Sequence, residues 1–208
     1  MNITSSVIND YIIGLLPKPD PVLAEMEAFA RRKGFPIIGP IVGPFLRQLA
    51  FATGAKSIFE MGSGFGYSAC WFAGGMRNGG KIICTDGSDE NRQRALTYLG
   101  RAGLDSMVDF RVGNALEIIK AFDGPFDIIL NDIDKKGYPE AFDLAIPRLR
   151  RGGLFITDNV LWSGRILHKN PTPESKAILE FNRKLFRSKE VISSIIPIRD
   201  GLGIAVKL

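Results

Sequence analysis

The sequence predicts an α/β fold with a mostly parallel sheet and helices on both faces. Three observations carry this prediction. Short apolar segments alternate with helical segments from Lys56 onward, which is typical of successive βαβ units. The chain closes with two apolar segments joined by only Arg199, Asp200 and Gly201, which indicates a hairpin and therefore an antiparallel strand. The length of 208 residues suits a single domain, residues 1–208.

Residues 1–54 are predicted to form a helical extension that covers the cleft of the core, residues 55–208. Asp20 is a candidate cap for a helix that has Pro21 in its first position and ends near Gly34. A further apolar helix is expected from Ile41 to Thr53. The segment Gly34 to Pro44 holds three glycines and three prolines among apolar residues, and it is interpreted as either a lid or a dimer contact.

The core is expected to contain seven strands in a Rossmann-like arrangement, five of them parallel. The predicted parallel strands are Ser57–Met61, Lys81–Thr85, Met107–Val112, Phe126–Leu130 and Leu154–Thr157. The predicted helices are Tyr67–Met76, a Ser88-capped helix running to about Gly103, Ala115–Phe122, Pro139–Leu149 and Pro173–Ser188. The hairpin strands are Val191–Ile198 and Leu202–Leu208. Five strand–helix units followed by a hairpin are the layout of a class I methyltransferase.

The composition, with 45% hydrophobic and 24% charged residues, is that of a globular protein. No apolar run approaches the roughly 20 residues that cross a bilayer, so no membrane partner is expected. Met1 to Tyr11 lacks the basic start and apolar core of a secretory signal, and a cytoplasmic location follows as the expectation. Cys70 and Cys84 are predicted to be buried free thiols, not zinc ligands.

Glycine-rich residues follow the first predicted parallel strand, in the segment Glu60 to Ser68. Ligands of open α/β sheets bind at the carboxyl ends of the strands, and glycine allows a ligand to approach the backbone closely. The glycine spacing is two and then two, with Tyr67 where a dinucleotide fingerprint needs its third glycine. This spacing argues against NAD. The alternative interpretation is a tight turn that binds nothing.

Polar residues follow the next two strands. Asp86 ends the second strand, 26 residues after Glu60, and is predicted to accept hydrogen bonds from both hydroxyls of a ribose. Asn114 follows the third strand and is predicted to reach an adenine edge.

A second polar cluster follows the fourth and fifth strands, in Asn131 to Lys135 and in Thr157 to Asn159. Both strand ends are expected at the same edge of the sheet as the glycine loop. Two carboxylates and an amide oxygen form a hard oxygen set that suits magnesium or calcium. The alternative is that these residues cap helices and form turns, with Lys135 an ordinary surface lysine.

These segments resemble the metal-dependent caffeoyl-CoA and catechol O-methyltransferase family, which is a class I S-adenosylmethionine (SAM)-dependent family with small bacterial-type members. LNDIDKKGY (Leu130–Tyr138) is similar to its VDADKxxY motif, and GGLFITDNVLWSG (Gly152–Gly164) to GGxxxxDNxLWxG. The loop at Glu60 is similar to ExGxxxGYS. TPES, FNRKL and IPIRDGLGIAVK resemble the closing helix and hairpin. The resemblance covers residues from about Gly54 to the C-terminus.

The resemblance implies two cofactors, SAM and a divalent metal, with Mg²⁺ first and Ca²⁺ or Mn²⁺ as alternatives. The implied metal ligands are Asp132, Asp158 and Asn159. Lys135 and Asp132 are the implied catalytic residues, with Lys135 taking the phenolic proton. The predicted cofactor-binding residues are Glu60, Gly62, Ser63, Gly64, Ser68, Asp86, Gly87, Asn114, Ala115 and Asp132.

The implied activity is transfer of a methyl group to a hydroxyl of a catechol-like small molecule, a phenolic acceptor. Trp162 is predicted to pack near this acceptor. Asn131 replaces the apolar residue that is usual before the first metal ligand, and it is predicted to tune the metal or contact the acceptor. Asn114 stands where an acidic residue is common. The resemblance also implies a homodimer.

The net charge of +5 keeps one alternative open, a tRNA hydroxyuridine O-methyltransferase of the same fold. A nucleic-acid partner is not favoured, because the basic residues are spread along the chain.

Overall fold

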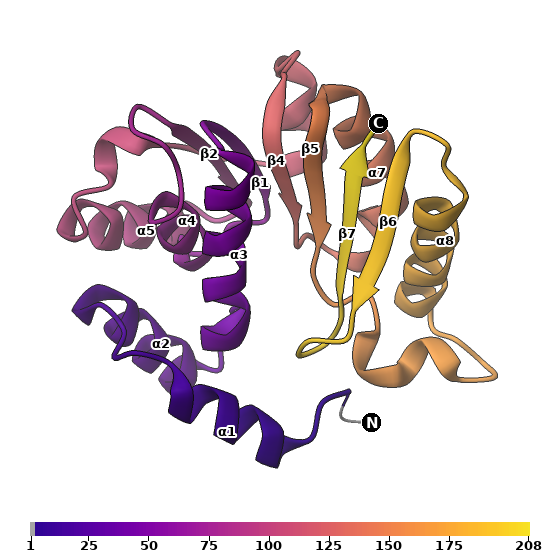
Figure 1. Ribbon diagram of the computed structural model, residues 1–208, viewed down its shortest axis with the longest axis horizontal. Helices are drawn as coiled ribbons and strands as arrows, with labels where there is room; N and C mark the ends of the chain where they lie inside the picture. The colour runs from indigo at the N-terminus through magenta and orange to yellow at the C-terminus, as the bar shows by residue number, and fades with distance from the viewer. Residues whose placement is uncertain (1–2) are drawn as a thin grey trace.

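The computed structural model describes residues 3–208 and contains a seven-stranded sheet in the order β3-β2-β1-β4-β5-β7-β6 (Figure 1). The strands are β1 Ser57–Met61, β2 Lys81–Asp86, β3 Val108–Val112, β4 Phe126–Asn131, β5 Leu149–Thr157, β6 Val191–Ile196 and β7 Leu202–Lys207. β1 to β5 pair in parallel, whereas β7 pairs antiparallel with both β5 and β6. The predicted α/β fold with an antiparallel C-terminal hairpin is confirmed.

Helices flank both faces of this sheet. They are α1 Ser6–Leu15, α2 Pro21–Lys33, α3 Gly39–Thr53, α4 Tyr67–Ala73, α5 Asp89–Arg101, α6 Ala115–Ile118, α7 Tyr138–Ala145 and α8 Pro173–Arg187. Buried side chains of α2 to α5 form a core on one face, and those of α6 to α8 form a core on the other. Within residues 3–208, no helix is long and apolar enough to cross a lipid bilayer.

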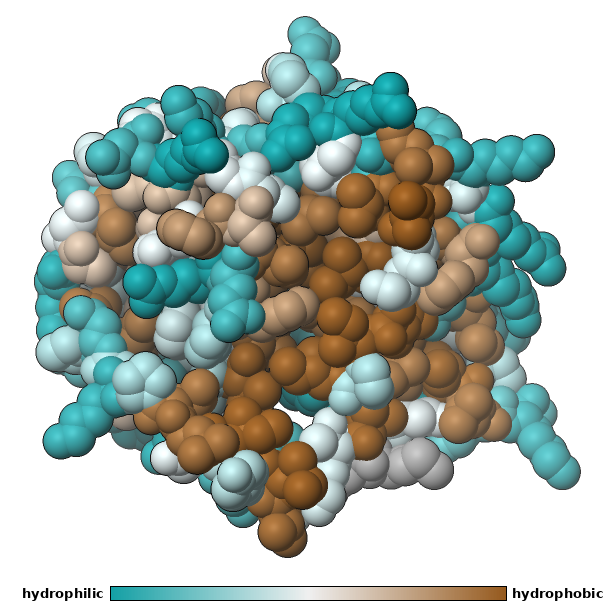
Figure 2. All heavy atoms as spheres, in the orientation of Figure 1, coloured by the Kyte–Doolittle hydropathy of each residue, from teal (hydrophilic) through white to brown (hydrophobic). Residues whose placement is uncertain are grey.

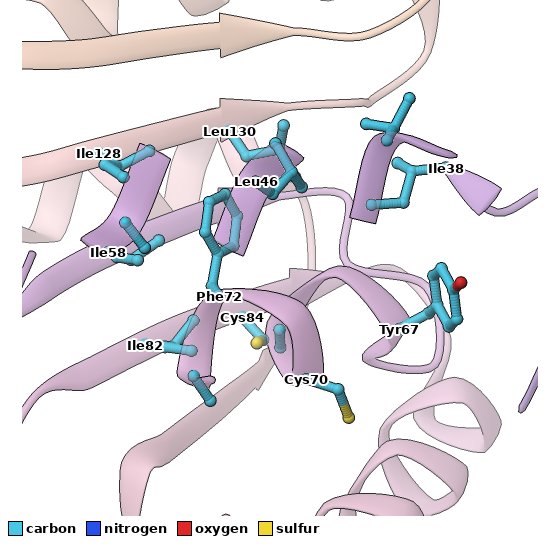
Figure 3. Close-up of a cluster of buried hydrophobic side chains, with 14 of the residues drawn as sticks. Ile38, Leu46, Ile58, Tyr67, Cys70, Phe72, Ile82, Cys84, Ile128 and Leu130 are labelled. Carbon is cyan, nitrogen blue, oxygen red and sulfur yellow. The ribbon is translucent and has the colours of Figure 1, made fainter. Parts of the chain in front are cut away.

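The core beneath α3 and α4 fixes the first strands of the sheet. Phe72 of α4 lies among Leu46 of α3, Ile58 of β1 and Ile82 of β2, all four fully buried (Figure 3). Close packing of these branched and aromatic side chains excludes water and contributes most of the stabilisation here. Cys70 and Cys84 are buried free thiols, as predicted.

Helix caps form where the sequence predicts them. The Asp20 carboxylate accepts a hydrogen bond from the Val22 amide at 2.8 Å, and the Ser88 hydroxyl accepts one from the Asn91 amide at 3.2 Å. α2 ends at Gly34, whose φ of 62° is the left-handed conformation that glycine adopts without strain.

Several predicted boundaries are wrong. α6 ends at Ile118 and not at Phe122, and β6 ends at Ile196 and not at Ile198. Three further boundaries differ for a local reason. α4 ends at Ala73, before two glycines, and not at Met76. α7 ends at Ala145, because Pro147 lacks the amide that would continue the helix. β5 begins at Leu149, which pairs with Phe126 across a register shift, and not at Leu154. The glycines at 152 and 153 conceal this early pairing in the sequence.

The amino ends of the parallel strands are tied together by one partly buried acid. The Asp127 carboxylate accepts hydrogen bonds from the amides of Lys56 at 2.7 Å and Ser57 at 2.9 Å, and it pairs with Arg150 of β5. These bonds hold β1, β4 and β5 in register at their amino ends. The polar residues that follow these strands meet at the opposite, carboxyl end of the sheet.

Candidate active site

Three adjoining cavities open at the carboxyl edge of the sheet, and all three are lined by Gly62 and Asp132. The main cleft, about 480 Å³, reaches Lys135, Asp158 and Asn159. The side cleft, about 570 Å³, extends toward the ends of β2 and β3. The third cavity, about 30 Å³, lies between the glycine loop and α4. The predicted metal ligands and most of the predicted cofactor-binding residues thus border these adjoining cavities.

Gly62 lets the glycine loop pack directly against β4. Its φ is 84°, and a Cβ at this position would lie 2.5 Å from the carbonyl oxygen of Asp132. The amides of Gly62 and Ser63 donate to the side chain and backbone of Thr85 at 3.3 Å and 2.7 Å. A larger residue would therefore push the loop away from the strand ends.

The predicted cofactor-binding residues lie around these cavities, with one exception. Asp86 lines both clefts, and its carboxylate accepts hydrogen bonds from the Gly64 amide at 3.2 Å and the Ser88 amide at 2.9 Å. Asn114 lines the side cleft and uses its side-chain oxygen to cap α6 through the Leu116 amide at 2.9 Å. The others that line a cavity are Gly62, Ser63, Gly64, Ser68, Gly87, Ala115 and Asp132.

Glu60 is the exception, because it lies fully buried beneath the glycine loop. Its carboxylate accepts a hydrogen bond from the Cys84 thiol at 3.5 Å. Burial raises its pKa to about 7, and the hydroxyls of Ser63 and Ser68 oppose this rise. Its predicted contact with the cofactor stays a prediction, and in the structure its carboxylate lies under the loop that lines the cavity.

The predicted metal ligands converge in the main cleft. The ammonium of Lys135 lies 3.0 Å from Asp132 Oδ1 and 2.8 Å from Asn159 Oδ1. Asp158 accepts hydrogen bonds from the Asn159 amide at 2.9 Å and from Arg199 at 2.7 Å. The Asp132 and Asn159 oxygens therefore meet at one positive charge, whereas the Asp158 carboxylate meets another.

Asp158 shows the electrostatic cost of this convergence. Its side chain is only 1% exposed. Burial and the negative charge of Asp132 raise its pKa to about 6, whereas the Arg199 guanidinium opposes the rise. In the structure each carboxylate is paired with a cation of the protein, Asp132 with Lys135 and Asp158 with Arg199.

The donor chemistry fits a hard cation. Across the described part of the chain, no three His, Cys, Asp or Glu side chains are grouped to hold a metal. The third donor here is the amide oxygen of Asn159. Two carboxylates and an amide oxygen suit Mg²⁺, Ca²⁺ or Mn²⁺ and not zinc.

Lys135 is not an ordinary surface lysine, so that alternative is wrong. Its side chain is 12% exposed, and its ammonium lies 5.0 Å from the ring centre of Tyr138 and 5.5 Å from that of Trp162. The Tyr138 hydroxyl in turn donates to the Asp158 carbonyl at 2.9 Å. Packed rings and oxygen acceptors together fix the amine at the cleft.

The loop after β5 is held in strained backbone conformations. Asn159, Trp162 and Ser163 have positive φ angles of 59°, 48° and 52°, which cost energy for residues other than glycine. The turn between β6 and β7 holds this loop in place, because the Val160 amide donates a hydrogen bond to the Gly201 carbonyl at 3.1 Å. Trp162 lines the main cleft, where it was predicted to meet the acceptor.

Phe35, Pro36 and Ile37, between α2 and α3, line both the main cleft and the third cavity. The Phe35 ring packs edge-on against the Phe65 ring, with 5.0 Å between the two ring centres. Of the two interpretations of this segment, its position favours a cover over the cleft.

Asn131 does not reach the cleft. Its side chain is fully buried, beside Thr157 on the face of the sheet that packs against α7 and α8, and it lines none of the three cavities. Neither of its side-chain polar atoms has a hydrogen-bond partner among the described residues. The predicted acceptor contact is corrected accordingly.

Arg199 is a cleft residue that the sequence predictions missed. It lines the main cleft and pairs with Asp158, although it lies about 40 positions further along the chain. The sequence could have predicted this position, because the hairpin turn that contains Arg199 lies at the same end of the sheet as the residues after β5.

Known proteins resemble this chain along nearly its whole length. Residues 19–208 match the family model described as O-methyltransferase. A catechol O-methyltransferase from Niastella koreensis is 33% identical over 211 residues, which cover 96% of each chain. A caffeoyl-CoA O-methyltransferase from Eucalyptus globulus is 30% identical and covers 80% of this chain and 72% of its own.

Solved structures agree with the fold and with the cofactor. The O-methyltransferase from Bacillus cereus in complex with SAH has a TM-score of 0.89 and 28% identity, with 97% of each chain covered. The O-methyltransferase TomG from Streptomyces achromogenes, in complex with SAM, has a TM-score of 0.89 and 26% identity, with 97% of this chain and 96% of that chain covered.

Proposed function

Because the chain belongs to the O-methyltransferase family and is a SAM-dependent enzyme of it, we propose that it methylates one hydroxyl of a catechol-like small molecule with the help of a divalent cation. The observation that carries this proposal is the convergence of the Asp132 and Asn159 oxygens at Lys135, next to the glycine loop. The named relatives act on catechol or caffeoyl-CoA, which favours a small phenolic acceptor over the tRNA alternative.

SAM is assigned to the space that the side cleft and the glycine loop enclose. Asp86 would accept hydrogen bonds from the ribose hydroxyls of SAM. Gly62 and Gly64 permit close approach of its methionine part to the backbone of the loop. The sulfonium supplies an already activated methyl group, so no residue has to activate the donor. The work of the protein is alignment of the acceptor oxygen with the methyl carbon.

The divalent cation is assigned to Asp132, Asp158 and Asn159. A phenol with a pKa near ~10 is a weak nucleophile at neutral pH. A cation bound by these residues would stabilise the phenolate oxygen and would also favour the neutral amine of Lys135.

Lys135 is the proposed general base. Its Nζ would accept the proton of the acceptor hydroxyl as the oxygen–methyl bond forms and the carbon–sulfur bond breaks. Tyr138 and Trp162 hold the amine by packing, and Phe35, Pro36 and Ile37 exclude water from the cleft.

Methyl transfer from labelled SAM to catechol tests the mechanism. We expect transfer with Mg²⁺, and loss of transfer with a chelator or with Asp158→Ala. Lys135→Met should lower kcat by about 10²- to 10⁴-fold while SAM still binds, as measured by calorimetry. Lys136→Met is the matched control, because that lysine is 63% exposed and pairs with Glu174 outside the ligand set. Transfer that survives both chelation and Asp158→Ala would reject the role of the cation.

We further propose that two copies of the chain associate through α1. Val7, Tyr11 and Leu15 follow one another at four-residue intervals, so they share one face of the helix, and each is at least 65% exposed. Phe51 of α3 is 79% exposed. Figure 2 shows apolar surface over α1 and between α3 and the C-terminal hairpin. A monomer seldom exposes so much apolar area without a partner.

A further inference from the structure

We propose that Arg199 and the pocket beside it form a second acceptor subsite, which selects catechols that carry a carboxylate substituent. This inference rests on the proposed function and names the acceptors that the same cleft prefers.

The outer pocket adjoins the main cleft. It has a volume of about 340 Å³ and lies between the N-terminal segment, represented by Thr4, Ser6 and Asn9, and the turn between β6 and β7. Asn159 and Arg199 line both cavities. These two residues form the boundary between the cavities, where a substituent on an acceptor in the main cleft would lie beside Arg199.

The backbone places Arg199 firmly at this boundary. Its φ is 54°, a left-handed conformation that costs energy for a residue with a side chain. The turn is closed by a hydrogen bond from the Gly201 amide to the Ile198 carbonyl at 2.9 Å. The Thr4 hydroxyl also donates to the Pro197 carbonyl at 3.2 Å, which joins the opposite wall of the pocket to the same turn.

The guanidinium has donors left for an acceptor. Arginine carries five N–H donors in a planar fork. The structure shows one side-chain hydrogen bond from Arg199, from Nη1 to Asp158 Oδ2 at 2.7 Å, and the side chain is 35% exposed. The remaining donors can bind both oxygens of a carboxylate, which is the strong and directional form of this interaction.

The acids that line the main cleft, Asp86, Asp132, Asp134, Asp158 and Glu174, do not line the outer pocket. Arg199 is the cation and Asp200 the acid among the residues that line the outer pocket. The Asp200 carboxylate already accepts a hydrogen bond from the Ser163 amide, and Asp200 does not line the main cleft. Lys135 also lines the main cleft, but its proposed role is to accept the proton of the acceptor hydroxyl. Arg199 is thus the cation beside a substituent that reaches the outer pocket.

Acceptor selectivity tests the proposal. We would measure kcat/KM for catechol, 3,4-dihydroxybenzoate and dopamine with saturating SAM and Mg²⁺. The unmodified protein should prefer the acid to catechol and catechol to the amine. Arg199→Met should lower the ratio of acid to catechol by about 10- to 100-fold, and Arg199→Lys should retain a larger part of it. Replacement of Arg199 also removes its ion pair with Asp158, which lowers the rate with every acceptor. The ratio of kcat/KM for the acid to that for catechol is therefore the readout.

Arg165→Met is the matched control. Arg165 lies 4.9 Å above the Trp162 ring and does not line the main cleft or the outer pocket, so its loss should leave the ratio unchanged. An equal fall with Arg165→Met, an unchanged ratio with Arg199→Met, or a preference for dopamine would overturn the inference. If the unmodified protein methylates no catechol at all, the proposed function fails instead.

Discussion

At the scale of single residues, the buried acid Glu60 links pH to stability. Its pKa of about 7 lies above the ordinary value of 4.5. Between these two pH values the folded protein holds the proton and the unfolded chain does not. Glu60 therefore lowers the free energy of unfolding progressively as pH rises from 4.5 to 7, and its effect is constant above that range.

Glu60→Gln should remove this pH dependence. The variant should gain stability relative to the unmodified protein as pH rises, by up to about 3 kcal/mol, as measured by urea unfolding at a series of pH values. Glu25→Gln is the control, because Glu25 is exposed and Arg101 lowers its pKa. A stability difference between Glu60→Gln and the unmodified protein that does not change with pH would contradict the assignment.

Residue types and their order along the chain were sufficient to predict most of the cleft. Asp132, Lys135, Asp158 and Asn159 follow strands of one parallel sheet, so their meeting follows from topology. The full burial of the Asn131 side chain could not be predicted from the sequence, because a polar residue at a strand end does not show which face of the sheet it will occupy. Its burial depends on pairing with Thr157 of β5, which only the folded chain shows.

At the scale of elements, the loop after β5 and the hairpin turn form one unit. The Leu161 amide donates to the Asp200 carbonyl at 3.0 Å. A Cβ on Gly201 would lie 2.4 Å from Leu161 Cγ, and Gly201 has a φ of 85°. The turn thus supports the loop that carries Asn159 and Trp162.

Gly201→Ala should damage the acceptor side of the site more than the cofactor side. We expect a loss of roughly 1–3 kcal/mol of stability and a raised KM for catechol, with SAM affinity little changed. Thermal unfolding, steady-state kinetics and calorimetry give these three values. Gly100→Ala in α5 is the control, because that position has open space for a Cβ. A larger loss of SAM affinity than of catechol affinity would show that the loop and turn do not act as one unit.

The types and order of the core elements followed from the sequence, but some of their ends did not. Alternating apolar and helical segments predict strands and helices well, because each buries one face. The early start of β5 at Leu149 depends on pairing with Phe126 across an irregular register. Such pairing is set by the neighbouring strand and leaves no local pattern.

At the scale of the whole molecule, the exposed stripe on α1 predicts the oligomeric state. The unmodified protein should be a dimer at micromolar concentrations in analytical ultracentrifugation. Tyr11→Lys should shift it toward monomer, because a charge in the interface loses its water. Leu167→Lys is the control, since Leu167 is equally exposed, at 73%, and lies outside α1. A monomeric unmodified protein would refute the proposed association.

The hydrogen bond between Thr4 and Pro197 joins residues 193 positions apart. α1, which follows Thr4, buries no side chain, so little packing holds this segment in place. The outer wall of the acceptor pocket should therefore be among the last parts of the fold to form and among the first to open. Access to the pocket can then fluctuate while the sheet, tied at its other edge by Asp127, stays intact.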